Sequence, residues 1–431
     1  MREQAAGSAS TGQARRRAAE HLLEGLDQPR ILSAMSPQQP DELLSALVDV
    51  GLSRNTPMTV LVADLEGTFS FIGARETEAM RNGLLTVVTL AGAVPRRLGA
   101  LVDHVPRTLW DIDRMLADGT IPVDIVVARV HETQDSGTFS FGRMVGYTPS
   151  ALLAAARVAL EVAPKVDAPP GPSIPRTRAD VLVVDPGYSP PEPAAARPTR
   201  PLAETIGRLV AEMIPRGATL QLGLGVVPDA VVPALGRRVD LSFHSGILPA
   251  SVADALASGM LGGPDTTTVH THVATGVMSW PSGTPRWAGQ VTLRPVSVTH
   301  APGVLAGIER LWAVNSAFEV DLNGQVNAEY AAGVRVASAG GQVDFFQGAH
   351  VSPGGASVLV LPSRTQDGRG RIRATLDAPH IVTTPGSLLD VVVTEFGVAR
   401  LTGLSATGRA EALISVAHPD DRAALNAARS A

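Results

Sequence analysis

A glycine-bearing turn within Leu220–Ala230 (LQLGLGVVPDA) is the first segment whose residue types could do chemistry. An apolar run leads into the turn, and a segment of helical character follows it. Glycines at a strand-to-helix turn let backbone N–H groups approach a ligand oxygen, and the helix N-terminus adds positive potential. The segment therefore predicts a binding loop, against the alternative of a plain turn in which glycine allows close packing. Its candidate ligand-binding residues are Gly223, Leu224, Gly225, Val226 and Val227.

Histidines are the other candidates for chemistry, because imidazole is the side chain best suited to proton transfer near neutral pH. His244 stands in SFHSG and His300 in RPVSVTHAP, while His270 and His272 share TVHTHVATG. A His-x-His pair on a strand places both rings on one face, as a metal site requires. No third ligand has a spacing that fits this pair, so we predict no bound metal. For each histidine the alternative is a packing role.

The segments that must position these residues alternate in character along the chain. Short apolar runs typical of buried strands are separated by helix-like stretches, which predicts βαβ units and a mainly parallel sheet. The expected strands are 57–64, 84–91, 122–130, 181–184, 219–222, 291–298, 342–346 and 356–362, and the expected helices are 108–116, 151–162, 203–214 and 229–235.

A chain of 431 residues is long for one domain, so two α/β domains are expected. The sharpest change in composition is a proline-rich stretch over residues 167–201, which predicts an interdomain connector. The predicted organisation is then a flexible N-terminal tail and helix (1–40), an N-terminal α/β domain (41–166), the connector, and a C-terminal α/β domain (202–431).

Composition also excludes several classes of protein. The net charge is −5 and no basic cluster stands out, which argues against nucleic acid as a partner. No window approaches the run of about 18 apolar residues that spans a bilayer, and the first residues lack a secretory apolar core. Cysteine is absent, which excludes disulfides and thiolate catalysis. We therefore expect a cytoplasmic protein that does not insert into membranes.

Three motifs late in the chain carry a specific resemblance. They are Val392–Arg422 (VVTEFGVARLTGLSATGRAEALISVAHPDDR), Asn315–Val326 (NSAFEVDLNGQV) and Ser338–Phe345 (SAGGQVDF). Together they resemble the acetyl-CoA hydrolase/CoA-transferase family, which includes 4-hydroxybutyrate and succinyl-CoA:acetate CoA-transferases, and the resemblance extends from about residue 50 to the end. It implies two open-sheet α/β domains of the CoA-transferase type (NagB/RpiA-like), a homodimer, and coenzyme A or acyl-CoA as a substrate, with a small carboxylate, water or another acceptor as the partner.

The resemblance also assigns residues to a site. In this family an L-Q-x-G-x-G segment lines the CoA thioester site, which implies that role for the turn from Gly223 to Val227. A glycine pair in the family passes close to the acyl-CoA carbonyl, which implies the same for Gly340 and Gly341.

Two positions depart from the family pattern. A glutamate that forms a glutamyl-CoA thioester normally follows an H/Y-S/T pair, but here His244 and Ser245 are followed by Gly246. An asparagine that donates to the thioester oxyanion normally follows R-P-x-x-[IVY]-[ST], and here that position is His300. Imidazole can donate to an oxyanion or act as a base, so His300 and His244 are the candidate catalytic residues.

Three hypotheses about function follow. The first is an acyl-CoA-processing enzyme that hydrolyses the thioester or transfers the acyl group directly, without a glutamyl-CoA intermediate. The second is a conventional CoA-transferase whose glutamate lies elsewhere, with Glu319 or Glu395 as the fallback. The third is a repurposed or non-catalytic relative in specialised metabolism.

Overall fold

The computed structural model describes residues 2–4, 8–189, 201–238, 240–261, 272–277, 280 and 290–429. By their mutual contacts the residues divide into two units. The first comprises residues 1–192 with two segments from later in the chain, 293–297 and 335–340. The second comprises residues 193–292, 298–334 and 341–431. The domain bounds expected from the sequence stay a prediction.

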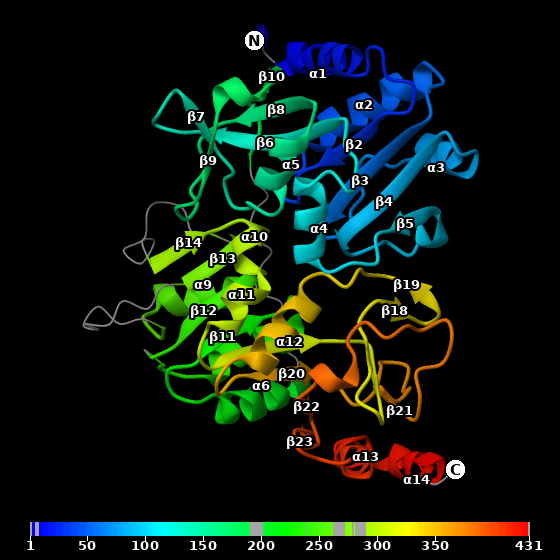
Figure 1. The fold of residues 1–431 in the computed structure, drawn as a ribbon, viewed down its shortest axis with the longest axis vertical. Helices are drawn as coiled ribbons and strands as arrows, with labels where there is room; N and C mark the ends of the chain where they lie inside the picture. Colours follow the sequence, from blue (N-terminus) through cyan, green and yellow to red (C-terminus); the bar gives the residue numbers. More distant parts are fainter. Residues whose placement is uncertain are drawn as a thin grey trace. The chain divides into compact units, whose positions relative to one another are not determined.

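A parallel sheet forms the centre of the first unit (Figure 1). Among the described residues its strand order is β1-β10-β8-β6-β2-β3-β4-β5, and β7 pairs antiparallel with β6 and with β9. The strands are β1 (Arg2–Gln4), β2 (Arg30–Ser33), β3 (Met58–Asp64), β4 (Leu85–Gly92), β5 (Val102–His104), β6 (Ile125–Glu132), β7 (Thr138–Ser140), β8 (Arg157–Ala163), β9 (Ser173–Pro175) and β10 (Val181–Val184). The helices are α1 (Ser8–Leu22), α2 (Asp41–Ser53), α3 (Ala74–Arg81), α4 (Leu109–Ala117) and α5 (Thr148–Ala154), with 3₁₀ turns at Gly99–Leu101 and Arg176–Arg178.

Apolar runs explain why these strands lie inside the unit. In β6 every residue except the last is buried, as expected for a parallel strand covered on both faces. Val60, Val87, Val127 and Ala159, from β3, β4, β6 and β8, join one core with Leu43 and Leu47 of α2.

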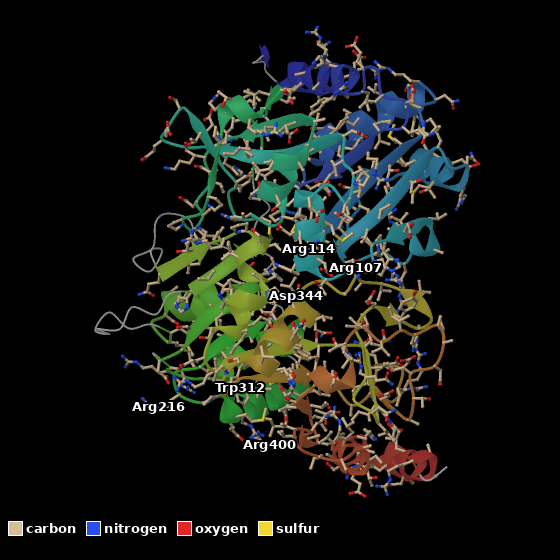
Figure 2. The ribbon with its side chains drawn as sticks, viewed as in Figure 1. Arg107, Arg114, Arg216, Trp312, Asp344 and Arg400 are labelled. Carbon is tan, nitrogen blue, oxygen red and sulfur yellow. The ribbon has the colours of Figure 1, made fainter. Side chains whose placement is uncertain are left out.

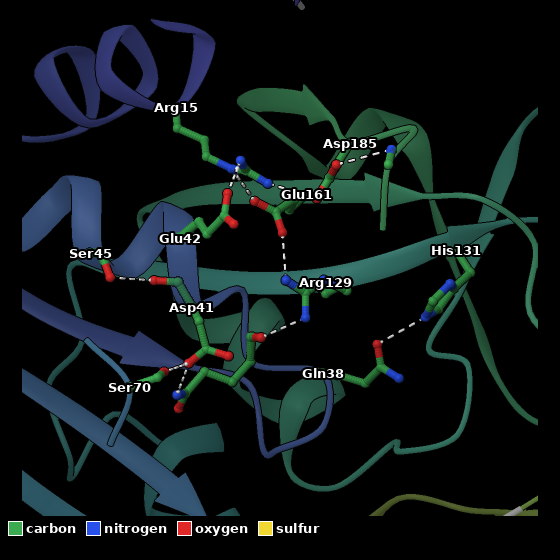
Figure 3. Close-up of polar contacts among 12 residues, drawn as sticks. Arg15, Gln38, Asp41, Glu42, Ser45, Ser70, Arg129, His131, Glu161 and Asp185 are labelled. Atoms are coloured by element: carbon green, nitrogen blue, oxygen red, sulfur yellow. Dashed lines mark hydrogen bonds and ion pairs between the residues drawn. The ribbon is translucent and has the colours of Figure 1, made fainter. Parts of the chain in front are cut away.

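A buried network of charges ties α1 to this sheet (Figure 3). Glu161 on β8 has no solvent exposure and accepts from Arg15 Nε at 2.9 Å and from Arg129 Nη2 at 2.8 Å. Arg15 also pairs with Glu42 and with Asp185, the latter at 2.7 Å. One buried carboxylate therefore holds two buried guanidinium groups, which is stable only while all partners are present.

A segment from late in the chain completes the first unit. The N–H of Val94 donates to Val336 O at 2.9 Å, and the N–H of Ser338 donates to Gly92 O at 3.0 Å. The N–H of Leu109 at the start of α4 donates to Gly340 O at 3.0 Å. The chain passes from the first unit to the second between Gly340 and Gly341.

The second unit has its own sheet. Among the described residues the order is β14-β13-β12-β11-β15-β20-β22-β23. The strands are β11 (Thr219–Leu222), β12 (Ser242–Leu248), β13 (His272–Val277), β14 (Val291–Leu293), β15 (Leu311–Ser316), β20 (Ala356–Val360), β22 (Val391–Thr394) and β23 (Gly397–Arg400). The helices are α6 (Pro201–Met213), α7 (Val226–Asp229), α8 (Val231–Ala234), α9 (Ala250–Ala257), α10 (Val296–Thr299), α11 (Pro302–Ala306), α12 (Gln342–Val351), α13 (Ala406–Ser415) and α14 (Pro419–Arg429).

Small sheets flank this core. One contains β16 (Glu319–Asp321), β17 (Val326–Asn327) and β21 (Ile372–Arg373), and the other pairs β18 (Tyr330–Ala331) with β19 (Val334–Arg335). A 3₁₀ turn at Gly386–Leu388 precedes β22.

Trp312, labelled in Figure 2, lies on β15 of the main sheet and donates its indole N–H to Gly354 O at 3.2 Å. None of the described helices combines the length and apolar character needed to cross a bilayer.

The predicted α/β class with open sheets is confirmed, and most predicted elements are present. Three predictions were wrong. Residues 151–162 are not one helix, because α5 ends at Ala154 and Arg157–Ala163 forms β8 between β6 and β10. Residues 291–298 are a strand only to Leu293, since Pro295 precedes α10. Residues 342–346 begin α12 rather than a strand, because the preceding Gly340, with φ of +58°, turns the chain before Gly341 caps the helix.

Candidate functional site

Strand β12 places His244 and Gly246 on one face of the second sheet, because alternate residues of a strand point the same way. Ser245 points to the other face, where it is fully buried. Its hydroxyl oxygen lies 3.2 Å from Leu222 O and 2.9 Å from Ile247 O, so its one proton is directed at these carbonyls. A serine committed to two backbone carbonyls is a poor nucleophile, so the site on this strand is the face with His244 and Gly246.

Thr299 holds both candidate histidines. The Nε2 of His244 lies 2.9 Å from Thr299 O, and because a carbonyl only accepts, Nε2 carries the proton. The Nδ1 of His244 is then an acceptor, and within the described residues nothing bonds to it. The Thr299 hydroxyl lies 2.8 Å from His300 Nδ1. If the hydroxyl donates, His300 carries its proton on Nε2, which is the nitrogen that faces the two glycines described next.

The ring of His300 packs with its Nε2 against two glycines, where a side chain would be tight at Gly246 and would clash at Gly341. A Cβ added to Gly246 would lie 3.2 Å from His300 Nε2, and one added to Gly341 would lie 2.6 Å from the same atom. Phe345 of α12 covers the ring, with the two centroids 4.7 Å apart. His244 approaches Phe345 edge-on at 6.4 Å. The structure therefore brings together His244, Gly246, His300, Gly341 and Phe345.

Burial keeps both imidazoles neutral. His300 is 1 % exposed, and burial lowers its pKa from 6.5 to about 3, with a smaller lowering from His244. Burial also lowers the pKa of His244, although its hydrogen bond to Thr299 opposes the effect. A neutral imidazole with so low a pKa is a weak base, but its N–H still donates. The surroundings of His300 thus favour donation over proton abstraction.

The glycine-bearing turn follows β11 directly and lies beside β12, where Ser245 bonds to Leu222 O. Gly223 donates to Val314 O at 2.8 Å, and Asn315 Oδ1 would lie 2.5 Å from a Cβ at that position. Close packing therefore accounts for glycine at this first position. Leu224 is 42 % exposed and Gly225 is exposed with φ of +144°, a conformation that favours glycine.

The next two residues of the turn open α7. Val226 is half-buried and Val227 is buried. Within the described part of the chain, the N–H groups of Leu224 and Gly225 contact no acceptor. These two donors are the groups of the turn that remain available to a ligand.

The glycine pair at residues 340–341 leads into α12, whose N-terminal N–H groups follow directly. Asp344, labelled in Figure 2, lies buried in the first turn of this helix. Gly341 is the member of the pair that contacts His300, whereas Gly340 bonds to Leu109 in the first unit.

The alternative glutamates both have structural partners. Glu319 lies 2.7 Å from His380 Nδ1 and accepts from Asn327 Nδ2 at 3.1 Å. Glu395 accepts from the N–H of Ser363 at 2.9 Å and from its hydroxyl at 2.6 Å. Carboxylates held in this way organise the small sheet and the end of β22.

The described residues contain no cluster of side chains that could hold a metal ion. No group of three or more His, Cys, Asp or Glu side chains gathers there as an ion would require. His272 lies buried on β13, whereas His270 is outside the described residues.

Comparisons with known proteins bear on this arrangement. The model of the acetyl-CoA hydrolase/transferase C-terminal domain matches residues 286–429. The 4-hydroxybutyrate coenzyme A transferase of Clostridium kluyveri is 32% identical over 343 residues, which cover 75% of this chain and 76% of that protein. The chain belongs to the acetyl-CoA hydrolase/transferase family.

Solved structures agree with this family. RipA from Yersinia pestis has a TM-score of 0.81 at 27% identity, covering 97% of this chain and 98% of that one. The 4-hydroxybutyrate CoA-transferase from Porphyromonas gingivalis has a TM-score of 0.74 at 26% identity, covering 97% and 96%. Relatives in the family are CoA-transferases and acetyl-CoA hydrolases, so the protein is an acyl-CoA-processing enzyme.

Sequence reasoning missed two residues that organise the site. Thr299 orients both histidines. Its position directly before His300 was the one sign in the sequence that could have identified it. Phe345 was noted only as part of a motif, and its role as the cover of the His300 ring depends on α12 being a helix.

Proposed function

We propose that this protein cleaves acyl-CoA thioesters by direct attack of water or another acceptor, without a covalent glutamyl-CoA intermediate. The single observation that carries the proposal is the packing at Gly246, where a neutral histidine ring lies against a position that has no side chain. The partners of Glu319 and Glu395 support it further, because neither carboxylate is free to attack.

In the proposed reaction the histidines have different roles. His244 Nδ1 takes a proton from water as the water oxygen bonds to the thioester carbon. The Nε2–H of His300, the N–H groups of Leu224 and Gly225 in the glycine turn, and those of the pair 340–341 donate to the oxyanion that forms. The carbon–sulfur bond then breaks, the CoA thiolate takes the proton from His244, and the acid leaves. An acyl acceptor with its own hydroxyl would replace water in the same step.

A second candidate is conventional CoA transfer to a small carboxylate. It is favoured by the activity of the Clostridium kluyveri relative, a 4-hydroxybutyrate coenzyme A transferase. It needs a nucleophilic carboxylate, and the described site offers none at position 246. A homodimer and a cytoplasmic location stay predictions. The molar mass from light scattering would test whether the protein is a dimer.

The deciding experiment measures free CoA released from a panel of acyl-CoAs, with and without acetate. A thiol-reactive dye suits it because the protein has no cysteine. Release without acetate supports hydrolysis, whereas acyl exchange that requires acetate supports CoA transfer. Silence with every acyl-CoA would overturn both and support the repurposed relative.

Variants of the two histidines test their separate roles. We expect His300→Ala to lower the hydrolysis rate by roughly 10²–10³, the usual cost of one oxyanion donor, and His300→Asn to keep part of the rate because the amide still donates. His244→Gln should lose roughly 10²–10⁴ through the missing base. The matched control is His350→Ala, an exposed histidine of α12, which should leave the rate unchanged. If His300→Ala behaves like the control, His300 only packs.

A further inference from the structure

Buried polar side chains at the ends of β11 and β15 lie next to the glycine-bearing turn of the second unit. Gln221 on β11 and Asn315 on β15 form a reciprocal amide pair, with N···O distances of 3.2 and 2.7 Å. Both side chains are more than nine-tenths buried. Gln221 lies two residues before Gly223, and the Gly223 N–H donates to Val314 O, next to Asn315 on β15. The end of β15 therefore sets the position of the glycine turn.

Gln342 links this strand end to α12. Its Nε2 donates to Ser316 O at 3.1 Å, and its Oε1 accepts from the Thr384 hydroxyl at 3.1 Å. Since Ser316 O only accepts, the amide has a single orientation, and Thr384 must donate. Gln342 is 8 % exposed and Thr384 is fully buried, so neither bond is easily replaced by water.

The two bonds of Gln342 lie close to both glycine-bearing segments. Gln342 directly follows Gly341, whereas Ser316 lies beside the other turn, with its Oγ 3.5 Å from where a Cβ on Gly225 would be. One side chain thus bonds the end of β15, which lies beside the turn at residues 223–225, to the start of the helix that follows Gly341. A change at Gln342 would move one glycine segment relative to the other.

We propose that Gln342 is a positioning residue that sets the spacing between the two sets of backbone donors around the thioester. The inference rests on the proposed function, because the donors matter only if acyl-CoA lies between them. Gln342 touches no reacting atom in this scheme and acts through Ser316 and Thr384. Small errors in such spacing are costly to catalysis, since a displacement near 1 Å can cost about 10²-fold in rate.

Two substitutions break the network at different bonds. In Gln342→Glu the carboxylate still accepts from Thr384, but it opposes Ser316 O with a second acceptor. Thr384→Val removes the other bond at nearly constant volume, and Thr384→Ser restores the donor. We expect kcat to fall by about 10- to 100-fold in the first two variants with KM changed less than threefold, and Thr384→Ser to recover most of the rate.

The matched control is Gln325→Glu. Gln325 Nε2 donates to Asp321 Oδ2 at 2.8 Å in the same unit, and among the described residues neither side chain bonds to Ser316, Gln342 or Thr384. The substitution likewise places two acceptors against each other, so it should lower stability without changing kcat per folded molecule. If Gln342→Glu changed stability alone, as the control should, Gln342 would be structural and the proposal overturned.

Hydrogen exchange of the unliganded protein separates this inference from the proposed function. In Gln342→Glu and Thr384→Val, peptides covering residues 220–230 and 338–346 should both exchange faster than in the parent, and neither should in Gln325→Glu. Faster exchange in both peptides of a variant whose parent hydrolyses no acyl-CoA would show that Gln342 links the two glycine segments. The same result would reject the proposed function. Faster exchange confined to residues 338–346 would overturn the coupling, whatever the activity.

Discussion

Asp113 offers a sharp test of how burial sets charge in the first unit. It lies on α4, is 2 % exposed, and accepts from the Ser150 hydroxyl of α5 at 3.0 Å. Its Oδ1 has no hydrogen-bond partner among the described residues. Burial raises the pKa of this carboxyl from 3.8 to about 7, and the bond from Ser150 offsets the rise only in part.

The sign and size of the effect on stability follow from that pKa. Between pH 4 and pH 7 the folded protein keeps a proton that the unfolded chain has released, so stability falls as pH rises through this window. At ~1.4 kcal/mol per pH unit the loss reaches ~4 kcal/mol above pH 7, as an order of magnitude. Asp113→Asn cannot ionise, so its contribution should stay constant across the window.

The assay is urea unfolding at intervals from pH 4.5 to 8.5, followed by hydrogen exchange in peptides of α4 and α5. The difference in unfolding free energy between Asp113→Asn and the parent should grow in favour of the variant as pH rises. Asp103→Asn, at an exposed aspartate of the same unit, is the control and should follow the parent profile. Parallel profiles for the parent and Asp113→Asn would refute the reasoning.

Three further predictions concern the buried charges and the site. Glu161→Ala should cost about 3–5 kcal/mol in urea unfolding, because it removes the carboxylate that two buried guanidinium groups share, whereas Glu20→Ala, in an exposed i,i+4 pair, should cost less than about 1 kcal/mol. Equal costs would contradict the burial argument. Gly246→Glu alone should lower activity because its side chain displaces the His300 ring, and adding His300→Asn should relieve the clash, which a double-mutant cycle of rates would detect as non-additivity. Borohydride treatment after exposure to acyl-CoA should leave every glutamate-containing peptide at its original mass, and one reduced glutamate would restore the conventional CoA-transferase hypothesis.

Local pattern was enough to predict much of the fold. Runs such as Met58–Asp64 and Thr219–Leu222 are apolar over the length of a strand, and their burial in parallel sheets follows from that composition. Arg157–Ala163 was misassigned because its alanines and leucine suit a helix equally well. Pairing with β6 and β10 decided for a strand, and no local pattern contains those partners.

The candidate site divides in the same way. From the sequence alone we obtained the family, the glycine turn, the missing side chain at Gly246 and the unusual histidine at position 300, because each is a matter of residue type at a fixed spacing. Only the tertiary structure decided that His300 is buried against Gly246 and Gly341, and that Thr299 orients both imidazoles. A pKa of about 3 follows from that burial, and the protonation state of a histidine depends on surroundings that distant segments supply.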